Sequence, residues 1–216
     1  MGATMVLEAR EKKLSGTKRL NIIITGVGGQ GIITLATLIA RAALLSGTKA
    51  LVAETHGLSQ RGGSVEVHVR LGAVEAPLIP RGEADVLLGL ELIETTRRLD
   101  YVKTNGVILT SDVIMKPALP GVKLPGRDEL IEELQSANRI LVVVVPATSM
   151  ASEVGGLLFV NTMMLGALAA SGLLEGLVDP GKLERLVRGL RRGEENYRAY
   201  RLGFEYYSGL HRLPKT

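Results

Sequence analysis

A glycine-rich turn between a strand and a helix is the feature that most constrains the fold of this chain. Residues 20–45 read LNIIITGVGGQGIITLATLIARAALL. The short β-branched run that ends at Gly26 is typical of a buried parallel strand. Residues 30–46 are typical of a helix, which Gly47 would close. This strand, turn and helix, followed by a second strand at 49–54, predict a βαβ unit and therefore an α/β fold.

The rest of the chain continues this alternation. Apolar runs predict further strands at 84–90, 106–112 and 139–147, with the last at the centre of the sheet. Helical patterns occupy 91–102, 127–137, 161–172, 179–190 and 194–210. We predict an α/β fold with a Rossmann-like, mostly parallel sheet, helices on both faces and a helical C-terminal part at about 148–212. Residues 1–18 are expected to be a flexible leader, and 19–216 a single domain.

The segment SVEVHVR at 64–70 alternates between apolar and polar residues, which is typical of a half-exposed strand. Its valines would face the core. Its charged and imidazole side chains would lie on the polar face: Glu66, His68 and Arg70.

The turn itself matches a dinucleotide fingerprint, Gly26-x-Gly28-x-x-Gly31. Gly26 would permit the tight turn, Gly28 a close approach to a ligand, and Gly31 close packing of helix on strand. With Gly29 and Gln30 they would present helix N-terminal amides to an anion. Glu54 ends the second strand, near where a ribose-binding acid belongs. NAD binding, another anion, or glycines that serve packing alone all remain open.

A dense polar loop follows, ETHGLSQRGGSV at 54–65. Such loops at the carboxyl ends of strands are where α/β proteins bind ligands. Arg61 with the Gly62–Gly63 amides could hold a phosphate or a carboxylate. Gln60 and Ser64 would fix the loop or contact the ligand. His56 is the one candidate for proton transfer, and hydrogen bonding within the loop or at an interface is its alternative role.

Composition excludes several kinds of site. The chain has no cysteine, so it holds no thiolate zinc site and no Cys-ligated iron–sulfur cluster, and we expect no metal site. Few aromatic residues and no tryptophan argue against nucleic-acid binding by stacking. Residues 154–174 carry no charged group and four glycines, and we interpret them as a loop and a buried helix rather than a membrane span.

Three collinear motifs carry a resemblance to a known family: GVGGQGIITLA at 26–36, ETHGLSQRGGSVEVHVR at 54–70, and NTMMLGALAASG at 161–172. With these, the chain resembles the gamma-type component of 2-oxoacid:ferredoxin oxidoreductases, in particular the beta subunit of the indolepyruvate type. The resemblance spans residue 20 to about 175. It implies oxidative decarboxylation of an aryl pyruvate to an acyl-CoA, with coenzyme A as co-substrate and electrons passed to ferredoxin.

The same resemblance implies a division of labour between subunits. Thiamine diphosphate and iron–sulfur clusters would sit on a large partner subunit, and this chain would bind no cofactor and be inactive alone. The resemblance further implies a cytoplasmic protein with no nucleic-acid or membrane partner, which could form a homodimer when isolated. A pyruvate or branched-chain oxoacid enzyme, or a stand-alone NAD-binding protein with a Rossmann fold, are the alternatives.

Overall fold

The computed structural model describes residues 18–56, 63–116, 124–137 and 139–210. Six strands form one sheet in the order β2-β3-β1-β4-β5-β6. Strand β3 is antiparallel to both of its neighbours, and β1, β4, β5 and β6 pair in parallel. The strands are β1 (Arg19–Val27), β2 (Ala50–His56), β3 (Ser64–Gly72), β4 (Ala84–Gly89), β5 (Val102–Ser111) and β6 (Leu141–Val145). The predicted α/β fold with a mostly parallel sheet is confirmed.

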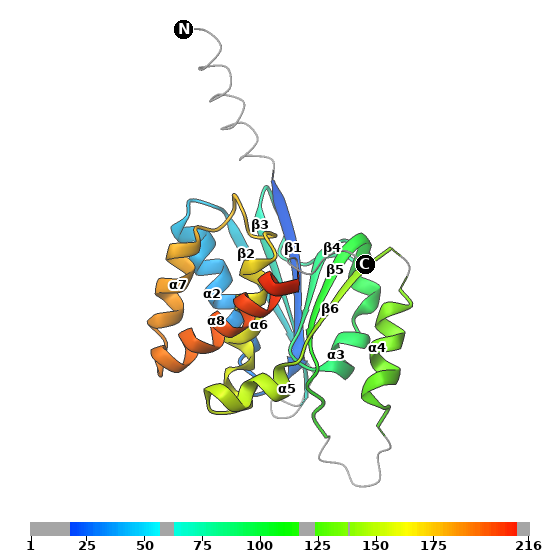
Figure 1. Cartoon of the computed structure of the whole chain (residues 1–216). Helices are drawn as coiled ribbons and strands as arrows, with labels where there is room; N and C mark the ends of the chain where they lie inside the picture. Colours follow the sequence, from blue (N-terminus) through cyan, green and yellow to red (C-terminus); the bar gives the residue numbers. More distant parts are fainter. Residues whose placement is uncertain (1–17, 57–62, 117–123, 138, 211–216) are drawn as a thin grey trace, which may run out of the picture.

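Helices cover both faces of this sheet, as predicted (Figure 1). The helices α2, α6, α7 and α8 lie on one face, and α3 and α4 on the other. Their bounds are α2 (Ile32–Leu45), α3 (Leu92–Thr96), α4 (Arg127–Gln135), α5 (Ala147–Met150), α6 (Val160–Ala170), α7 (Pro180–Arg188) and α8 (Gly193–Leu210). Short 3-10 turns lie at η1 (Leu99–Tyr101), η2 (Ala151–Val154) and η3 (Leu157–Phe159).

Successive side chains of β1 point to opposite faces of the sheet, so this one strand contributes to both hydrophobic cores. Ile22 and Ile24 belong to the larger core beneath α2 and α6, whereas Ile23 belongs to the smaller core beneath α3 and α4. All three side chains are fully buried. Burial of a side chain of this size stabilises a fold by about 1.5–3 kcal/mol. The uninterrupted apolar run is therefore what a strand buried on both faces requires.

Two expectations about strand order are wrong. The predicted βαβ unit has β2 running in the same direction as β1, but β3 lies between them and pairs with both. A hairpin-like return, β2 to β3, therefore replaces direct pairing of β1 with β2. The run at 139–147 forms the edge strand β6 rather than a central one, and Leu141 on it is 54% exposed.

The expected half-exposed character of β3 is also wrong. Glu66 and His68 are both buried, because the segment after β3 and the turn η1 cover the second face. His68 Nδ1 accepts a hydrogen bond from Ile79 N at 3.0 Å, and the Tyr101 ring packs edge-on against the imidazole at 5.6 Å. Arg70 also binds this covering segment, through the carbonyls of Ala76 and Leu78. The alternating polar residues of β3 therefore form a buried ionic face of the strand and not a solvent-exposed one.

The helical C-terminal part is joined by a close crossing of α6 and α8. A Cβ atom added at Gly166 would overlap the Tyr200 carbonyl, and one at Gly203 would overlap the Met163 carbonyl. The two backbones therefore touch where both side chains are hydrogen atoms. Helix α6 is buried along most of its length, as its apolar sequence predicts. The helix predicted at 179–190 begins as α7 with Asp179 as its N-cap, since the Asp179 carboxylate accepts from Lys182 N and Pro180 follows it.

A search for membrane-spanning helices within the described ranges found no single helix of sufficient length and hydropathy. One pair of helical segments, 147–154 and 157–170, passes on length and composition only when joined, and the pair is bent by 106°.

Candidate functional site

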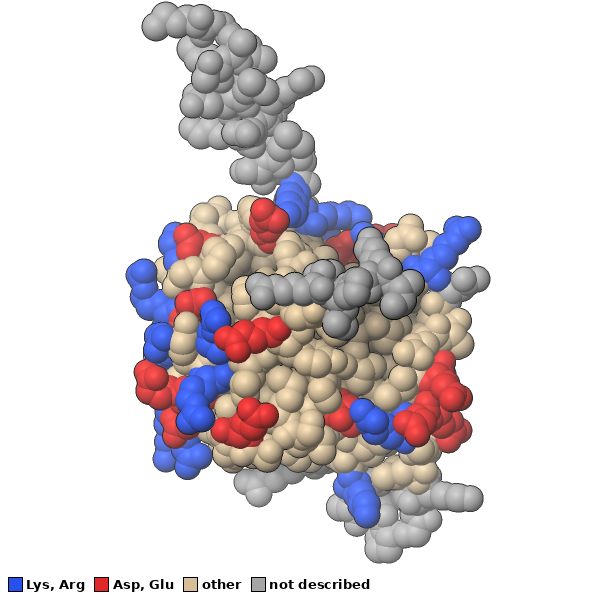
Figure 2. Space-filling view, viewed as in Figure 1, with Lys and Arg blue, Asp and Glu red and all other residues tan. Residues whose placement is uncertain are grey.

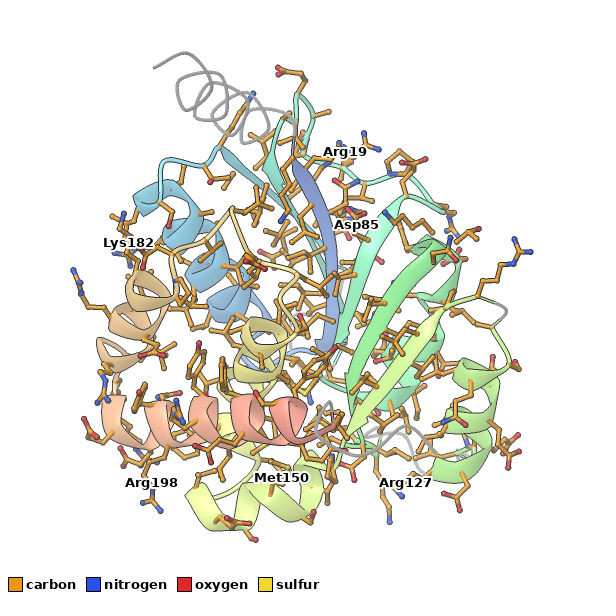
Figure 3. The ribbon with its side chains drawn as sticks, turned by 45° about the horizontal axis from the view of Figure 1, so that its top comes forward. Arg19, Asp85, Arg127, Met150, Lys182 and Arg198 are labelled. Carbon is orange, nitrogen blue, oxygen red and sulfur yellow. The ribbon has the colours of Figure 1, made fainter. Side chains whose placement is uncertain are left out.

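The glycine turn lies at the carboxyl edge of the sheet. Met150 and Arg127 mark this end of the molecule in Figure 3, opposite Arg19 and Asp85. Gly29 and Gly31 adopt φ values of +103° and +78°, which L side chains rarely adopt, so these two glycines are required by backbone conformation. The left-handed Gly31 is also the N-cap of α2, and no side chain caps this helix end. Its first-turn amides are therefore available to an anion.

The other glycines act differently from the sequence-based expectation. Gly26 is not left-handed; a Cβ atom there would lie 2.5 Å from Gln30 Oε1 and 3.2 Å from the Leu90 side chain. Gly31 does not provide packing of helix on strand, because a side chain there would strike Asn161 on α6. Gly28 donates from N to the Gly63 carbonyl at 2.9 Å, which ties the turn to the start of β3.

Gln30 acts as a clamp on the turn. Its Oε1 accepts from Val27 N at 2.7 Å, and its Nε2 donates to the Leu90 carbonyl at 2.9 Å. The side chain therefore joins the ends of β1 and β4, and these two bonds occupy its carbonyl and one N–H. Gln30 was predicted to be a ligand-binding residue; its contacts within the chain are those of a residue that shapes the turn.

Two grooves flank the turn and share Gly29, Gly31 and Thr34. The first, of about 510 Å³, lies between the turn and the β2–β3 pair; it is lined by Gly28, Gly29, Gly31, Ile32, Ile33, Thr34, Glu54 and Val65. The second, of about 480 Å³, lies between the turn and the helical C-terminal part; it is lined by Gly29, Gln30, Gly31, Thr34, Leu158, Phe159, Asn161, Leu190, Arg191, Arg192 and Asn196. The glycine turn is therefore open on both sides.

Arg191 and Arg192 are site residues that the sequence analysis missed. Arg191 and Arg192 fall between the helices predicted at 179–190 and 194–210, and nothing in their spacing relates them to residues 26–31. Both arginines are exposed, and within the described part of the chain neither guanidinium makes a hydrogen bond or an ion pair. Two cationic groups thus line a groove that also contains an uncapped helix N-terminus, an arrangement suited to a phosphate or carboxylate.

A chain of amide and hydroxyl contacts fixes the position of Arg191 and Arg192, here called the arginine turn, relative to the glycine turn. Asn196 Nδ2 donates to the carbonyls of Arg191 and Arg192, each at 3.0 Å. Asn196 Oδ1 lies 3.1 Å from the hydroxyl of Thr162, and Asn161 Nδ2 contacts the Gly31 carbonyl at 3.4 Å. Asn161 lies in the first turn of α6, whose N-cap is Phe159.

The remaining residues predicted from the polar loop divide between two faces of the sheet. Glu54 lines the first groove with the turn. Ser64 faces the opposite side, where its hydroxyl donates to Glu94 Oε2 at 2.5 Å and accepts from Arg98 Nη2 at 3.1 Å. Gln60, Arg61 and Gly62 lie outside the described residues, as does the side chain of His56, whose backbone pairs with Val65. Ser64 therefore does not share a groove with the glycines.

On that opposite face, Glu66 is the centre of a buried ionic cluster. Its Oε1 lies 2.9 Å from His68 Nε2 and accepts from Thr55 Oγ1 at 3.1 Å, and its Oε2 pairs with Arg98 Nε. Burial alone would raise the pKa of this carboxyl, but the His68 hydrogen bond and the Arg98 charge outweigh it and lower the pKa to about 2. Glu66 is therefore ionised at neutral pH and joins β2 and β3 to Arg98, which lies between α3 and η1.

A second buried carboxyl, Glu91, caps α3. Its oxygens accept from Glu94 N at 2.7 Å and Met115 N at 3.0 Å. Burial raises its pKa above the ordinary value. Within the described ranges, no group of three or more His, Asp or Glu side chains is placed to hold a metal ion. The cluster around Glu66 is thus a structural network of one anion with its donors.

Comparison with known proteins agrees with this geometry. The family model described as pyruvate ferredoxin/flavodoxin oxidoreductase matches residues 21–206, and the chain belongs to this family. The match includes all three motifs on which the resemblance rested, so the predicted family is confirmed. A particular relative is the indolepyruvate oxidoreductase subunit IorB of Archaeoglobus fulgidus. It is 46% identical over 153 residues, which cover 69% of this chain and 76% of the relative.

Two solved structures share the fold. The gamma subunit of a keto/oxoacid ferredoxin oxidoreductase from Geobacter sulfurreducens has a TM-score of 0.64 and 24% identity, and the match covers 88% of this chain and 99% of that chain. A 2-oxoglutarate:ferredoxin oxidoreductase from Magnetococcus marinus, solved with 2-oxoglutarate, coenzyme A and succinyl-CoA, has a TM-score of 0.66 and 20% identity. That match covers 93% of this chain and 32% of the longer one.

Proposed function

We propose that this chain is the non-cluster subunit of an indolepyruvate-type 2-oxoacid:ferredoxin oxidoreductase, and that its glycine-turn grooves bind the phosphate-bearing part of coenzyme A. The observation that carries the second part is the position of Arg191 and Arg192 in the groove beside the uncapped N-terminus of α2. The first part is supported by the family match and by the identity to subunit IorB.

The chemistry of the second groove suits a polyphosphate. Coenzyme A carries a pyrophosphate and a ribose phosphate, whose oxygens accept paired hydrogen bonds from a planar guanidinium group. Backbone amides at the start of α2 would bind one phosphate group, with the helix dipole adding a favourable field. Arg191 and Arg192 would bind another. Together with Gly29 and Gly31, these residues define the anion site that we assign to this chain.

Exposed apolar side chains around the grooves support an interface with a partner subunit. Ile33 is 52% exposed at the first groove, and Leu158 is 65% exposed at the second, next to Leu157 at 53%. Apolar side chains rimmed by polar groups are typical of protein–protein contact sites. We expect the partner to cover them, and Arg61 of the polar loop to lie at or near the same contact. In the isolated chain, a homodimer could cover this surface instead.

The partner would also supply the redox groups. A chain without cysteine cannot ligate an iron–sulfur cluster through thiolates, so the clusters and thiamine diphosphate belong on the large subunit, which passes electrons to ferredoxin. We place the complex in the cytoplasm and treat residues 19–216 as one domain that follows a leader at 1–18. Acting through the partner, this subunit would contribute to binding rather than to electron transfer.

The rival function is a stand-alone NAD-binding protein, which the position of Glu54 in the first groove favours. The strand order argues against it. An acidic residue that binds a ribose normally ends the strand next to β1, whereas here β3 separates β2 from β1. Adjacent strands are about 4.8 Å apart, so Glu54 is displaced by roughly one strand spacing. Titration of the isolated chain with NAD and NADP tests this rival, and tight binding would favour it.

The reconstituted complex gives the direct test of the proposed function. The chain and its large partner are purified separately and assayed, alone and mixed, for reduction of a viologen dye that depends on indolepyruvate, coenzyme A and thiamine diphosphate. We expect activity in the mixture only. Activity with pyruvate or a branched-chain oxoacid in place of indolepyruvate would keep the family and change the substrate. An inactive mixture would contradict the subunit assignment.

Variants of the arginine turn test the anion site. Loss of a charge-assisted bond to phosphate costs about 1.5–3 kcal/mol, which is roughly a tenfold to hundredfold rise in the KM for coenzyme A. We expect this rise in Arg191→Gln combined with Arg192→Gln, with the KM for the oxoacid unchanged. Arg185→Gln removes one positive charge from the exposed face of α7 and is the matched control. Equal effects of control and site variants would contradict the assignment.

A further inference from the structure

A third cavity lies at the far end of the helical C-terminal part, away from the glycine turn. Its volume is about 400 Å³, and residues from the end of α6, the segment 171–178, α7 and α8 line it. Its walls are largely apolar, with Ala169, Leu174, Val178, Leu183 and Phe204 among them. None of these residues lines either groove beside the glycine turn. The cavity is therefore a separate candidate site.

One polar group in this cavity lacks a partner. The hydroxyl of Tyr200, which lines the cavity, makes no hydrogen bond with any group in the described part of the chain, although Tyr200 is only 1% exposed. A buried polar group without a partner costs about 1–3 kcal/mol. Burial, together with the nearby Glu184 carboxylate, raises the pKa of this hydroxyl to about 12. The group is therefore a neutral phenol that can both accept and donate a hydrogen bond.

The two carboxylates that line the cavity, those of Glu184 and Glu175, form no ion pair with the described residues. No lysine or arginine is among the described lining residues of the cavity. Lys182 on α7 (Figure 3) directs its ammonium group to the Leu45 carbonyl at 2.6 Å. Lys18 donates to the backbone carbonyl of Glu175. Charged groups of both signs cover the outer surface over α7 and α8 (Figure 2). The nearest arginines of α7 and α8 are paired with other carboxylates, Arg188 with Glu194 and Arg201 with Glu205.

We propose that this cavity binds a small amphiphilic amine, with its apolar body against Leu183 and Phe204 and its ammonium group between the Tyr200 hydroxyl and the Glu184 carboxylate. The phenol oxygen accepts one ammonium N–H, and Glu184 supplies the counter-charge. Tyr197 Oη lies 3.4 Å from Glu184 Oε2 and steadies that carboxylate. The phenyl ring of Phe204 and the stacked rings of Tyr200 and Tyr197 favour an aromatic body. This inference is independent of the proposed function.

Calorimetric titration of the full chain with three probes of similar size tests the proposal: 2-phenylethylamine, 2-phenylethanol and 3-phenylpropionate. We expect the amine to bind at least about tenfold more tightly than either of the other two. Glu184→Gln should abolish this preference while leaving the affinity for the alcohol within about twofold. Tyr200→Phe, which removes one oxygen atom, should also weaken amine binding. Glu132→Gln, on the exposed face of α4, is the matched control and should change nothing.

Each outcome decides the matter. A preference for the amine that is lost in Glu184→Gln and in Tyr200→Phe but kept in Glu132→Gln supports the site. Binding of none of the probes at about 10 mM, equal binding of all three, or an unchanged preference in Glu184→Gln would overturn it. Because the readout is binding to this chain alone, the result does not depend on activity of the complex.

Discussion

The buried Glu66 carboxylate should make the stability of this chain depend on pH in a defined way. Its side chain is 8% exposed and is held by His68, Thr55 and Arg98. Glu66→Gln keeps the shape of the side chain and removes the charge. The substitution should leave the Arg98 guanidinium without its anion and weaken the connection between β3 and α3. We expect a folded but less stable protein.

The magnitude follows from the shift in pKa. The pKa falls from its ordinary value of 4.5 to about 2 in the folded protein. A shift of about 2.5 units at about 1.36 kcal/mol per unit corresponds to roughly 3 kcal/mol at pH 7. Because the folded-state pKa lies below the unfolded value, this contribution is complete above about pH 5 and is lost as the pH falls toward 2. About half of it should remain near pH 3.3.

Urea unfolding of the wild type and of Glu66→Gln, measured from pH 7 to pH 2.5, gives the free energies of unfolding. The difference between the two proteins should be about 3 kcal/mol at pH 7 and shrink to about 1 kcal/mol or less at pH 2.5. Glu75→Gln is the control, because Glu75 pairs with Lys49 while 94% exposed and should contribute less than about 1 kcal/mol.

Two results would refute this reasoning. One is a difference that stays constant from pH 7 to pH 2.5, which would show that the charge of Glu66 contributes nothing. The other is an effect of Glu75→Gln as large as that of Glu66→Gln, which would show that burial is irrelevant. A double-mutant cycle with Arg98→Met would then give the coupling of the pair directly, and we expect a favourable coupling at pH 7 only.

Three further predictions concern the helical part, all measured as free energies of unfolding in urea. Gly166→Ala should lower the free energy of unfolding by about 3 kcal/mol, because its Cβ atom meets the Tyr200 carbonyl. In the control Gly209→Ala, the Cβ atom would meet nothing within 4 Å, so stability should change by about 1 kcal/mol or less. Equal effects of the two substitutions would contradict the close crossing of α6 and α8. Asp179→Ala should cost about 1 kcal/mol through loss of the α7 cap, and no loss would contradict a capping role. Tyr200→Phe without ligand should leave stability unchanged or raise it by about 1 kcal/mol; a loss of that size would mean that the hydroxyl has a partner.

Local sequence predicted most elements because their signals are local. The β-branched run before Gly26, the glycine that closes the first helix at Gly47 and the helix predicted at 179–190 each depend on signals within a few residues, and the structure has them where they were expected. The position of β3 could not be predicted in the same way. Its insertion between β1 and β2 depends on long-range pairing, such as Ile23 opposite His68, that no periodicity encodes.

The burial of the polar side chains of β3 could not be predicted from the sequence either. Alternation at 64–70 correctly indicated a strand, but Glu66 and His68 are buried because Arg98 and Tyr101, more than thirty residues later, cover and neutralise them. The candidate site divides similarly. Gly29 and Gly31 could be predicted from spacing, whereas Arg191 and Arg192 reach the turn only through the α6–α8 packing. Residues 57–62 of the polar loop stay predictions.

The crossing at Gly166 and Gly203 has a consequence for how this chain can diverge in evolution. Because main-chain atoms set the distance between α6 and α8, substitutions among the apolar side chains of α8 have little leverage on its orientation. Asn161 near the start of α6 and Asn196 near the start of α8 then hold Arg191 and Arg192 at a fixed distance from Gly31. Surface and core residues of α6 and α8 can therefore change while the anion groove keeps its width, provided that Gly166 and Gly203 are retained.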